Sequence, residues 1–189
     1  RDRDTFLFSD TIGSNISFGA GDRGNRLEYN GQYDGQRRRR GYDEQYVRRM
    51  AAIAGADGFI SSMPDGYDTV VGERGVGLSG GQKQRLSLAR ALADNPSILI
   101  MDDTTSAVDM ETEAEIQRHL RDLDEKKTIV TIAHRISSVK DSDLILVLEH
   151  GRIVERGTHD ELVASHGRYW QIYSKQLGVD AGRSQGFEA

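Results

Sequence analysis

Residues 78–103, LSGGQKQRLSLARALADNPSILIMDD, carry the local signals of a helix followed by a strand. Ser79 is a residue type that caps helices, so the sequence predicts a helix from Gln82 to about Asp94. The apolar face of this helix carries Leu86, Ala89 and Leu92. Asn95-Pro96 ends the helix, because proline lacks the backbone N–H that a helix interior needs.

The end of the same stretch predicts a strand. Ile98–Met101 is continuously apolar, which is typical of a strand that is buried on both faces. Asp102 and Asp103 follow at the carboxyl end of this strand. Ligands of open parallel sheets bind at that end.

Helices and strands alternate after residue 103. Strands are expected at 128–132 and 144–148, and His150-Gly151 is expected to turn the chain into a hairpin strand at Ile153-Val154. Helices are expected at about 111–123, 135–140, 160–165 and 169–176. Such alternation predicts an α/β fold with a parallel sheet and an antiparallel hairpin at one edge.

The region before residue 78 is less regular. Residues 5–18 predict a loop and a short helical turn, and a helix is expected from Asp43 to near Gly55 or Gly58. Between them, residues 19–41 hold six glycines and the run Arg37–Arg40, which predicts a mobile loop. The glycine-rich tail from Gly178 is expected to be disordered.

Composition limits the classes of protein that remain. The chain has 189 residues, enough for one domain, and a formal net charge of −5. It holds no cysteine, which excludes disulfides and thiolate metal sites. Its longest apolar run, Leu144–Leu148, is too short to span a membrane. No basic footprint supports binding to nucleic acid. The chain begins with Arg1 instead of Met, so its length can describe a piece of a protein.

Three groups of residues could carry chemistry, and each has a plainer alternative. Asp102 and Asp103 suit Mg²⁺, which prefers oxygen ligands, or form a solvated acidic turn. Ser79 with the two following glycines is either a phosphate cradle at a helix N-terminus or an ordinary helix start. His134, two residues after a predicted strand, can reach a phosphate oxygen or serve as a surface residue.

The order and spacing of these groups closely resemble an ABC transporter nucleotide-binding domain. In that family Leu78–Arg85 corresponds to the signature motif, Ile98–Asp103 to the Walker B strand, Ser106–Asp109 to the D-loop and His134 to the switch histidine. Three further stretches are similar to the exporter branch of the family. They are Asp4–Ile12, Glu73–Gly75 and Gly151–Leu162. The first of them resembles the segment that follows the Q-loop glutamine.

The resemblance implies the C-terminal part of a P-loop NTPase (RecA-like) core together with the ABC helical subdomain. Residues 1–18 would be the Q-loop region and 19–94 the helical subdomain, with a basic glycine-rich insertion and the signature motif. Residues 95–177 would belong to the RecA-like core, and 178–189 would form the tail. The N-terminal Walker A portion would be missing, since no Gly-Lys pair occurs in the 189 residues.

The resemblance also implies roles. Two nucleotide-binding domains of the family sandwich two ATP molecules, each between the Walker motifs of one domain and the signature of the other. Asp102 would hold Mg²⁺ through water, Asp103 would stand at the catalytic base position, and His134 would contact the γ-phosphate. The residues implied to bind ATP are Leu78, Ser79, Gly80, Gly81, Gln82, Asp102, Ser106 and Asp109. Ser106–Asp109 would communicate across the dimer.

Departures from the family pattern lead to further hypotheses. Asp103 replaces the catalytic glutamate of the family, which suggests the impaired half of a heterodimeric exporter. Arg3 falls at the position of the Q-loop glutamine. Because the Walker A portion would be missing, the chain alone is expected to bind ATP poorly and to hydrolyse none. The insertion with Arg37–Arg40 is either a tolerated surface insertion or a contact with anionic lipid headgroups.

The implied partners are a second nucleotide-binding domain and the transmembrane domain of the same transporter. The implied location is the cytoplasmic face of the cell membrane. Two alternatives remain, a DNA-maintenance ATPase head and an inactive module that regulates by dimerising. The absence of sustained heptads disfavours the first, because such heads are split by long coiled coils.

Overall fold

The computed structural model describes residues 7–20, 42–72, 77–102, 107–123 and 127–178. The chain divides into two compact units, the first ending at Val130 and the second beginning at Thr131. Several sequence predictions fall on residues outside the described ranges. They concern most of the glycine-rich segment, the Glu73–Gly75 loop, the tail from residue 179, Arg3, Asp103 and Ser106.

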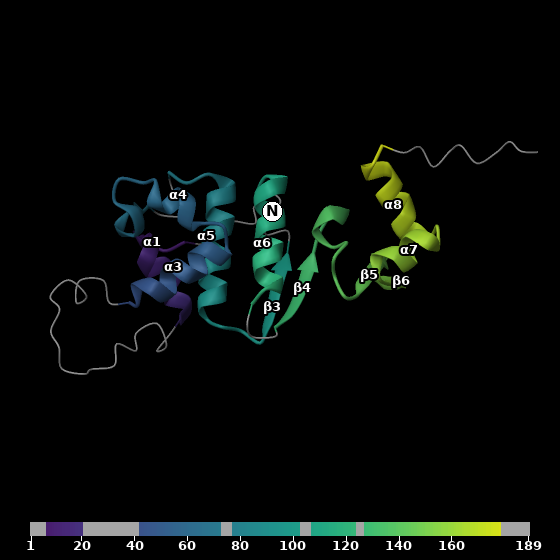
Figure 1. The fold of residues 1–189 in the computed structure, drawn as a ribbon, viewed down its shortest axis with the longest axis horizontal. Helices are drawn as coiled ribbons and strands as arrows, with labels where there is room; N and C mark the ends of the chain where they lie inside the picture. Colours follow the sequence, from purple (N-terminus) through teal and green to yellow (C-terminus); the bar gives the residue numbers. More distant parts are fainter. Residues whose placement is uncertain (1–6, 21–41, 73–76, 103–106, 124–126, 179–189) are drawn as a thin grey trace, which may run out of the picture. The chain divides into compact units, whose positions relative to one another are not determined.

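The helices of the first unit gather around α5, Gly80–Ala93 (Figure 1). Two helices that come earlier in the chain, α1 (Ile12–Ser17) and α3 (Glu44–Ile53), pack directly against α5. The remaining short elements are η1 (Phe18–Ala20), α4 (Asp57–Ser61), η3 (Gly66–Asp68), and the antiparallel strands β1 (Asp10–Thr11) and β2 (Val70–Val71). Both predicted helices, α3 and α5, are confirmed, and α5 begins two residues earlier than expected.

The core of the first unit lies between these helices. Leu86, Ala89 and Leu92 of α5 are buried as predicted, in one cluster with Ile12 and Val47. Burying an aliphatic side chain of this size stabilises a fold by about 1.5–3 kcal/mol. This packing holds α5 between α1 and α3.

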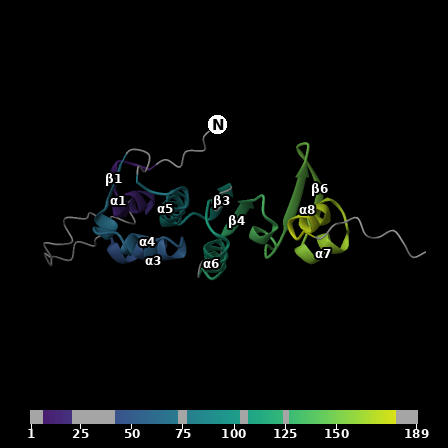
Figure 2. The ribbon, with the colours of Figure 1, turned by 90° about the horizontal axis from the view of Figure 1, so that it is seen from above.

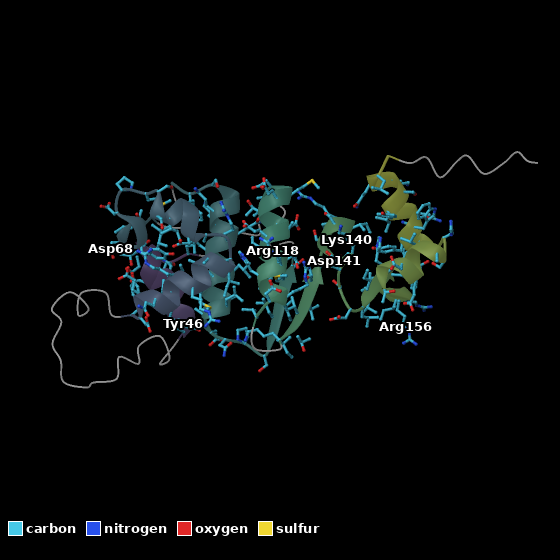
Figure 3. The ribbon with its side chains drawn as sticks, in the orientation of Figure 1. Tyr46, Asp68, Arg118, Lys140, Asp141 and Arg156 are labelled. Atoms are coloured by element: carbon cyan, nitrogen blue, oxygen red, sulfur yellow. The ribbon has the colours of Figure 1, made fainter. Side chains whose placement is uncertain are left out.

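Two polar side chains bond to backbone groups within the bundle. Buried Asn15 accepts a hydrogen bond from the Phe8 N–H (2.8 Å) and donates to the Phe8 and Thr11 carbonyl oxygens (both 3.0 Å). In addition, the Tyr46 hydroxyl donates to the Ala93 carbonyl oxygen at 2.8 Å (Tyr46 is labelled in Figure 3). These bonds satisfy backbone groups that would otherwise be buried without partners.

A strand–helix–strand segment follows α5. It consists of β3 (Ile98–Asp102), α6 (Met110–Arg121) and β4 (Thr128–Ile132). β3 pairs with β4, and their arrows point the same way in Figure 1. The strand predicted at 128–132 is confirmed with the same bounds, and the helix predicted at about 111–123 is confirmed as α6.

The prediction that β3 is buried on both faces is wrong for the structure as described. Leu99 and Met101 are buried in one cluster with Ile116 of α6, but Ile98 and Ile100 are 60% and 65% exposed. Side chains alternate across a strand, so these two isoleucines lie on the opposite face. Within the described residues nothing covers that face.

The second unit is a hairpin packed against two helices. β5 (Ile145–Glu149) and β6 (Arg152–Gly157) pair antiparallel, as predicted. His150 and Gly151 both have positive φ (50° and 75°), which suits a two-residue hairpin turn. Figure 2 shows α7 (His159–Ala164) and α8 (Arg168–Gln176) beside β6. The helix predicted at 135–140 is shorter in the structure, where it is the single turn η5 (Ile136–Ser138).

The described strands form three two-stranded sheets, β1–β2, β3–β4 and β5–β6. That β3, β4 and the hairpin belong to one sheet therefore stays a prediction. The core of the second unit gathers apolar side chains from η5, the hairpin and both helices: Ile136, Ile145, Val147, Leu162 and Tyr169. None of the helices in the described ranges has the length and hydropathy to cross a membrane.

Candidate functional site

The start of α5 is a preformed capping box. The Ser79 hydroxyl oxygen accepts from the Gln82 N–H at 3.2 Å, and Gln82 Oε1 accepts from the Ser79 N–H at 2.9 Å. The capping box thus satisfies the N–H groups of Ser79 and Gln82. Within the described residues the N–H of Gly80, in the first helical turn, has no acceptor, and Ser79 and Gly80 are both exposed.

The two glycines of the motif have different surroundings. Gly80 is exposed, whereas Gly81 is buried against Ala107. A Cβ on Gly81 would lie 2.6 Å from the Ala107 carbonyl oxygen, closer than real Cβ atoms come. In addition, the Ala107 N–H donates to Gln84 Oε1 at 3.1 Å. Gly81 therefore lets α5 pack closely against the segment that begins at Ala107.

Asp109 is the N-cap of α6. One carboxylate oxygen accepts from the Thr112 N–H at 2.9 Å and the other from the Thr112 hydroxyl at 2.8 Å. These hydrogen bonds, with a smaller effect from Arg85, hold the pKa of Asp109 below its usual range. The cap explains Asp109 structurally, and its communication across a dimer stays a prediction.

Arg85 joins α5 to the rest of the helical bundle. Its guanidinium donates to the Gly55 carbonyl oxygen at 2.7 Å and to the Gly81 carbonyl oxygen at 3.3 Å. It also lies 4.8 Å from the centre of the Phe59 ring, and burial lowers its pKa. Sequence reasoning did not select Arg85 or Gln84 as site residues, because their partners are 30 and 23 residues away.

Asp102 and His134 belong to different units. Asp102 is the exposed last residue of β3, and His134 is exposed two residues after the end of β4. β3 and β4 pair, so Asp102 ends one strand of this two-stranded sheet and His134 follows the other. Their proximity to each other stays a prediction. In the described part of the chain no three His, Asp or Glu side chains gather as a metal cluster.

The His134 segment has a partner that the sequence did not reveal. Gln176, the last residue of α8, bonds to backbone groups on both sides of Arg135. The amide nitrogen donates to the His134 carbonyl oxygen at 2.8 Å, and the amide oxygen accepts from the Ile136 N–H at 2.9 Å. A separation of about 40 residues leaves no local pattern by which to find this contact.

Comparison with known proteins identifies the family. A family model described as "ABC transporter" matches residues 11–106, about half of the chain. The chain belongs to the ABC transporter family. The match includes the capping box and β3, so the resemblance and the P-loop NTPase fold class inferred from the sequence are confirmed.

Individual ABC transporters support the exporter branch. The chain is 49% identical to an uncharacterized ABC transporter ATP-binding protein, YknU, of Bacillus subtilis, covering 92% of this chain and 26% of that protein. It is 42% identical to an ATP-dependent lipid A-core flippase of Aliivibrio fischeri, covering 91% of this chain and 26% of that protein. It is 47% identical to a putative multidrug export ATP-binding/permease protein of Staphylococcus aureus, covering 92% of this chain and 27% of that protein.

A solved ABC exporter structure gives the same result. A bacterial Atm1-family ABC exporter with ATP bound matches with a TM-score of 0.77 and 41% sequence identity. The match covers 92% of this chain and 27% of that one. The chain thus spans about a quarter of the length of these relatives.

Proposed function

We propose that this chain is the helical subdomain and C-terminal core of an exporter's nucleotide-binding domain. In this proposal the start of α5 binds the γ-phosphate of an ATP held by a second such domain. The observation that carries the proposal is the exposed capping box, in which the Gly80 N–H lacks an acceptor within the described residues. A helix N-terminus carries partial positive charge and favours phosphate.

The described residues fit ATP and Mg²⁺. Members of this family bind ATP, and the names of the relatives include ATP-binding and ATP-dependent proteins. Ser79 and Gly80 supply a hydroxyl and an N–H for phosphate oxygens. Asp102 offers a carboxylate at a strand end, which suits Mg²⁺ because this ion takes one or two carboxylates together with phosphate oxygens. When bound, Mg²⁺ would neutralise negative charge on the phosphates.

Phosphoryl transfer depends mainly on positioning and charge stabilisation, so the chain's own residues act by holding geometry. In our proposal Leu78, which packs against the core cluster, and Gln82 fix the helix start that Ser79 and Gly80 present. Gly81 and Gln84 hold that start against the D-loop. His134 contacts the γ-phosphate of the ATP on its own side.

We also propose that this chain is the impaired half of a heterodimer. Asp103, which lies outside the described residues, is one methylene shorter than the family's catalytic glutamate. A misplacement of roughly 1 Å can cost about a hundredfold in rate. The intact signature motif would then complete the competent site of the partner.

ATP hydrolysis by the assembled transporter tests both proposals. Changing the partner's Walker B glutamate to glutamine should abolish turnover, whereas Asp103→Asn should leave most of it. Equal losses would contradict the heterodimer, and an assembly that hydrolyses no ATP would contradict the proposed function itself.

The remaining assignments follow from the exporter proposal. The domain boundaries at residues 18, 94 and 177 and the partnership with a transmembrane domain are part of it. So is the location at the cytoplasmic face of the membrane. The exporter relatives favour this reading over a DNA-maintenance ATPase head or an inactive regulatory module.

A further inference from the structure

Gln176 holds the backbone that carries His134 by two hydrogen bonds of opposite sense. Its amide nitrogen donates to the His134 carbonyl oxygen at 2.8 Å, and its amide oxygen accepts from the Ile136 N–H at 2.9 Å. The carbonyl oxygen belongs to residue i and the N–H to residue i+2. In a parallel sheet, one residue of a neighbouring strand bonds the same two groups. The side chain thus replaces a missing strand partner for this short segment.

This arrangement requires a side-chain amide of this length. A glutamate would keep the acceptor for the Ile136 N–H but would place a second oxygen against the His134 carbonyl oxygen. A methionine at position 176 would have a similar length and helix propensity, and it would lose both bonds. These differences provide variants that separate hydrogen bonding from packing.

The helix that carries Gln176 is a firm support. At the N-terminus of α8, the Glu155 carboxylate accepts from the N–H groups of Arg168 (2.6 Å) and Tyr169 (2.8 Å). The Tyr169 side chain is buried, and its hydroxyl lies 2.7 Å from His159 Nδ1. α8 is therefore anchored to β6 and α7 by buried and charged contacts, so it can restrain what its last residue holds.

The segment itself is held at two points, and neither involves the imidazole of His134. The Ile136 side chain is buried in one cluster with Tyr169, and the Gln176 amide holds the backbone on both sides of Arg135. The His134 residue is exposed. Because the backbone around His134 is held while the residue itself is exposed, its imidazole can meet a ligand at a fixed place.

We infer that Gln176 is a positioning residue for His134, and that α8 sets the place from which His134 acts on ATP. The inference rests on the proposed function, in which His134 contacts the γ-phosphate. Without the two amide bonds the His134 segment would move by an ångström or more. The charge that develops during phosphoryl transfer would then lose its contact, while ATP binding by other groups would persist.

Steady-state ATP hydrolysis by the complete transporter tests this inference, with Gln176→Met as the variant. All variants are made in a background in which turnover depends on this chain's own ATP site, Asp103→Glu with the partner's Walker B glutamate changed to glutamine, and this background is the wild type of the comparison. We expect kcat to fall at least about tenfold with little change in KM for ATP, since misplacement by about 1 Å can cost a hundredfold. The matched control is Gln171→Met on the same helix, because Gln171 bonds through its side chain to Arg168. This control should stay within about twofold of the wild-type kcat.

A His134→Ala background separates positioning from general damage. If Gln176 acts through His134, then adding Gln176→Met to His134→Ala should cause no further loss of kcat. Losses that multiply, or equal effects of Gln176→Met and Gln171→Met, would overturn the inference. Thermal unfolding of the same samples guards against a folding defect, since we expect Gln176→Met and Gln171→Met to unfold at similar temperatures.

The same experiment distinguishes this inference from the proposed function. Hydrolysis by His134→Ala at the wild-type rate would show that His134 has no part in the reaction. It would overturn this inference and the proposed contact of His134 with the γ-phosphate, whereas an assembly that hydrolyses no ATP would contradict the proposed function itself. A strong loss in His134→Ala beside a normal kcat in Gln176→Met would overturn only the role of Gln176.

Discussion

Two adjacent glycines of the signature motif illustrate what single residues contribute. Gly80 faces open space apart from an ordinary contact with Ala107 Cβ, 3.5 Å from where its own Cβ would stand. Gly81 lies directly against the Ala107 carbonyl. The family resemblance assigns both to phosphate binding, whereas the packing distinguishes them. Gly81 is required by the fold, and Gly80 is free to serve a ligand.

A pair of alanine substitutions tests this distinction. Gly81→Ala should lower the free energy of unfolding by about 1–3 kcal/mol, because the new Cβ must displace the Ala107 backbone. Gly80→Ala should be neutral or slightly stabilising, since alanine loses less backbone entropy in a helix. Thermal unfolding of the two variants beside wild type measures the difference. Equal stability of the two variants would show that the 2.6 Å approach is not maintained.

Asp109 gives a prediction about pH. Hydrogen bonds from Thr112 depress its pKa in the folded state, so its contribution to stability is present above its unfolded pKa near 3.8 and is lost as pH falls through the folded value. Asn caps helices about as well but does not titrate in this range. The stability gap between wild type and Asp109→Asn should therefore be largest above pH 4 and shrink below it. If the difference in the free energy of unfolding between the two proteins stayed constant from pH 7 to pH 2, the titration of Asp109 would not contribute to stability.

At the scale of elements, α8 depends on a cap from another strand. Glu155 of β6 accepts from two N–H groups at the start of α8, and this places its carboxylate where a Cβ on Gly167 would stand, 1.8 Å away. The cap and the glycine are therefore coupled, which makes them suitable for a double-mutant cycle.

We expect Gly167→Ala to destabilise the wild-type protein, because the carboxylate must move out of its capping position. Glu155→Ala alone should cost about 0.5–2 kcal/mol, the usual value of a lost N-cap. In the Glu155→Ala background, Gly167→Ala should cost much less than in wild type. Unfolding experiments on the four proteins give the coupling directly, and strictly additive effects would contradict it.

The elements also show what the sequence could predict. The helix α5, the bounds of β4 and the hairpin turn at His150-Gly151 were predictable, because caps, periodicity and turn residues are local signals, although α5 begins two residues earlier than expected. The strands β1 and β2 were missed, since each has two residues and they pair across about 60 positions. The contacts of Gln84, Arg85 and Gln176 were missed for the same reason, as a side chain's distant partner leaves no trace in spacing.

At the scale of the whole molecule, the prediction that failed for β3 is informative. A continuous apolar run predicted burial on both faces, and the described residues cover one. The chain spans about a quarter of the length of each relative, and the uncovered face is consistent with our proposal that it is part of an exporter's nucleotide-binding domain. The sequence pattern thus predicted a property that the 189 residues alone do not display.

Gly80→Asp tests whether the start of α5 binds the γ-phosphate of a partner's ATP, as we propose. An aspartate in the first turn of a helix favours the folded state by about 0.3–1 kcal/mol, but it would repel phosphate. Gly80→Asn, of the same shape and without charge, is the control.

The measurement is steady-state ATP hydrolysis by the assembled transporter. We predict that Gly80→Asp unfolds at or above the wild-type temperature yet loses at least about a hundredfold in turnover, because the added carboxylate repels the phosphate from the donors that stabilise the transferred group. Gly80→Asn should lose less. Turnover at the wild-type rate in a well-folded Gly80→Asp variant would contradict the account.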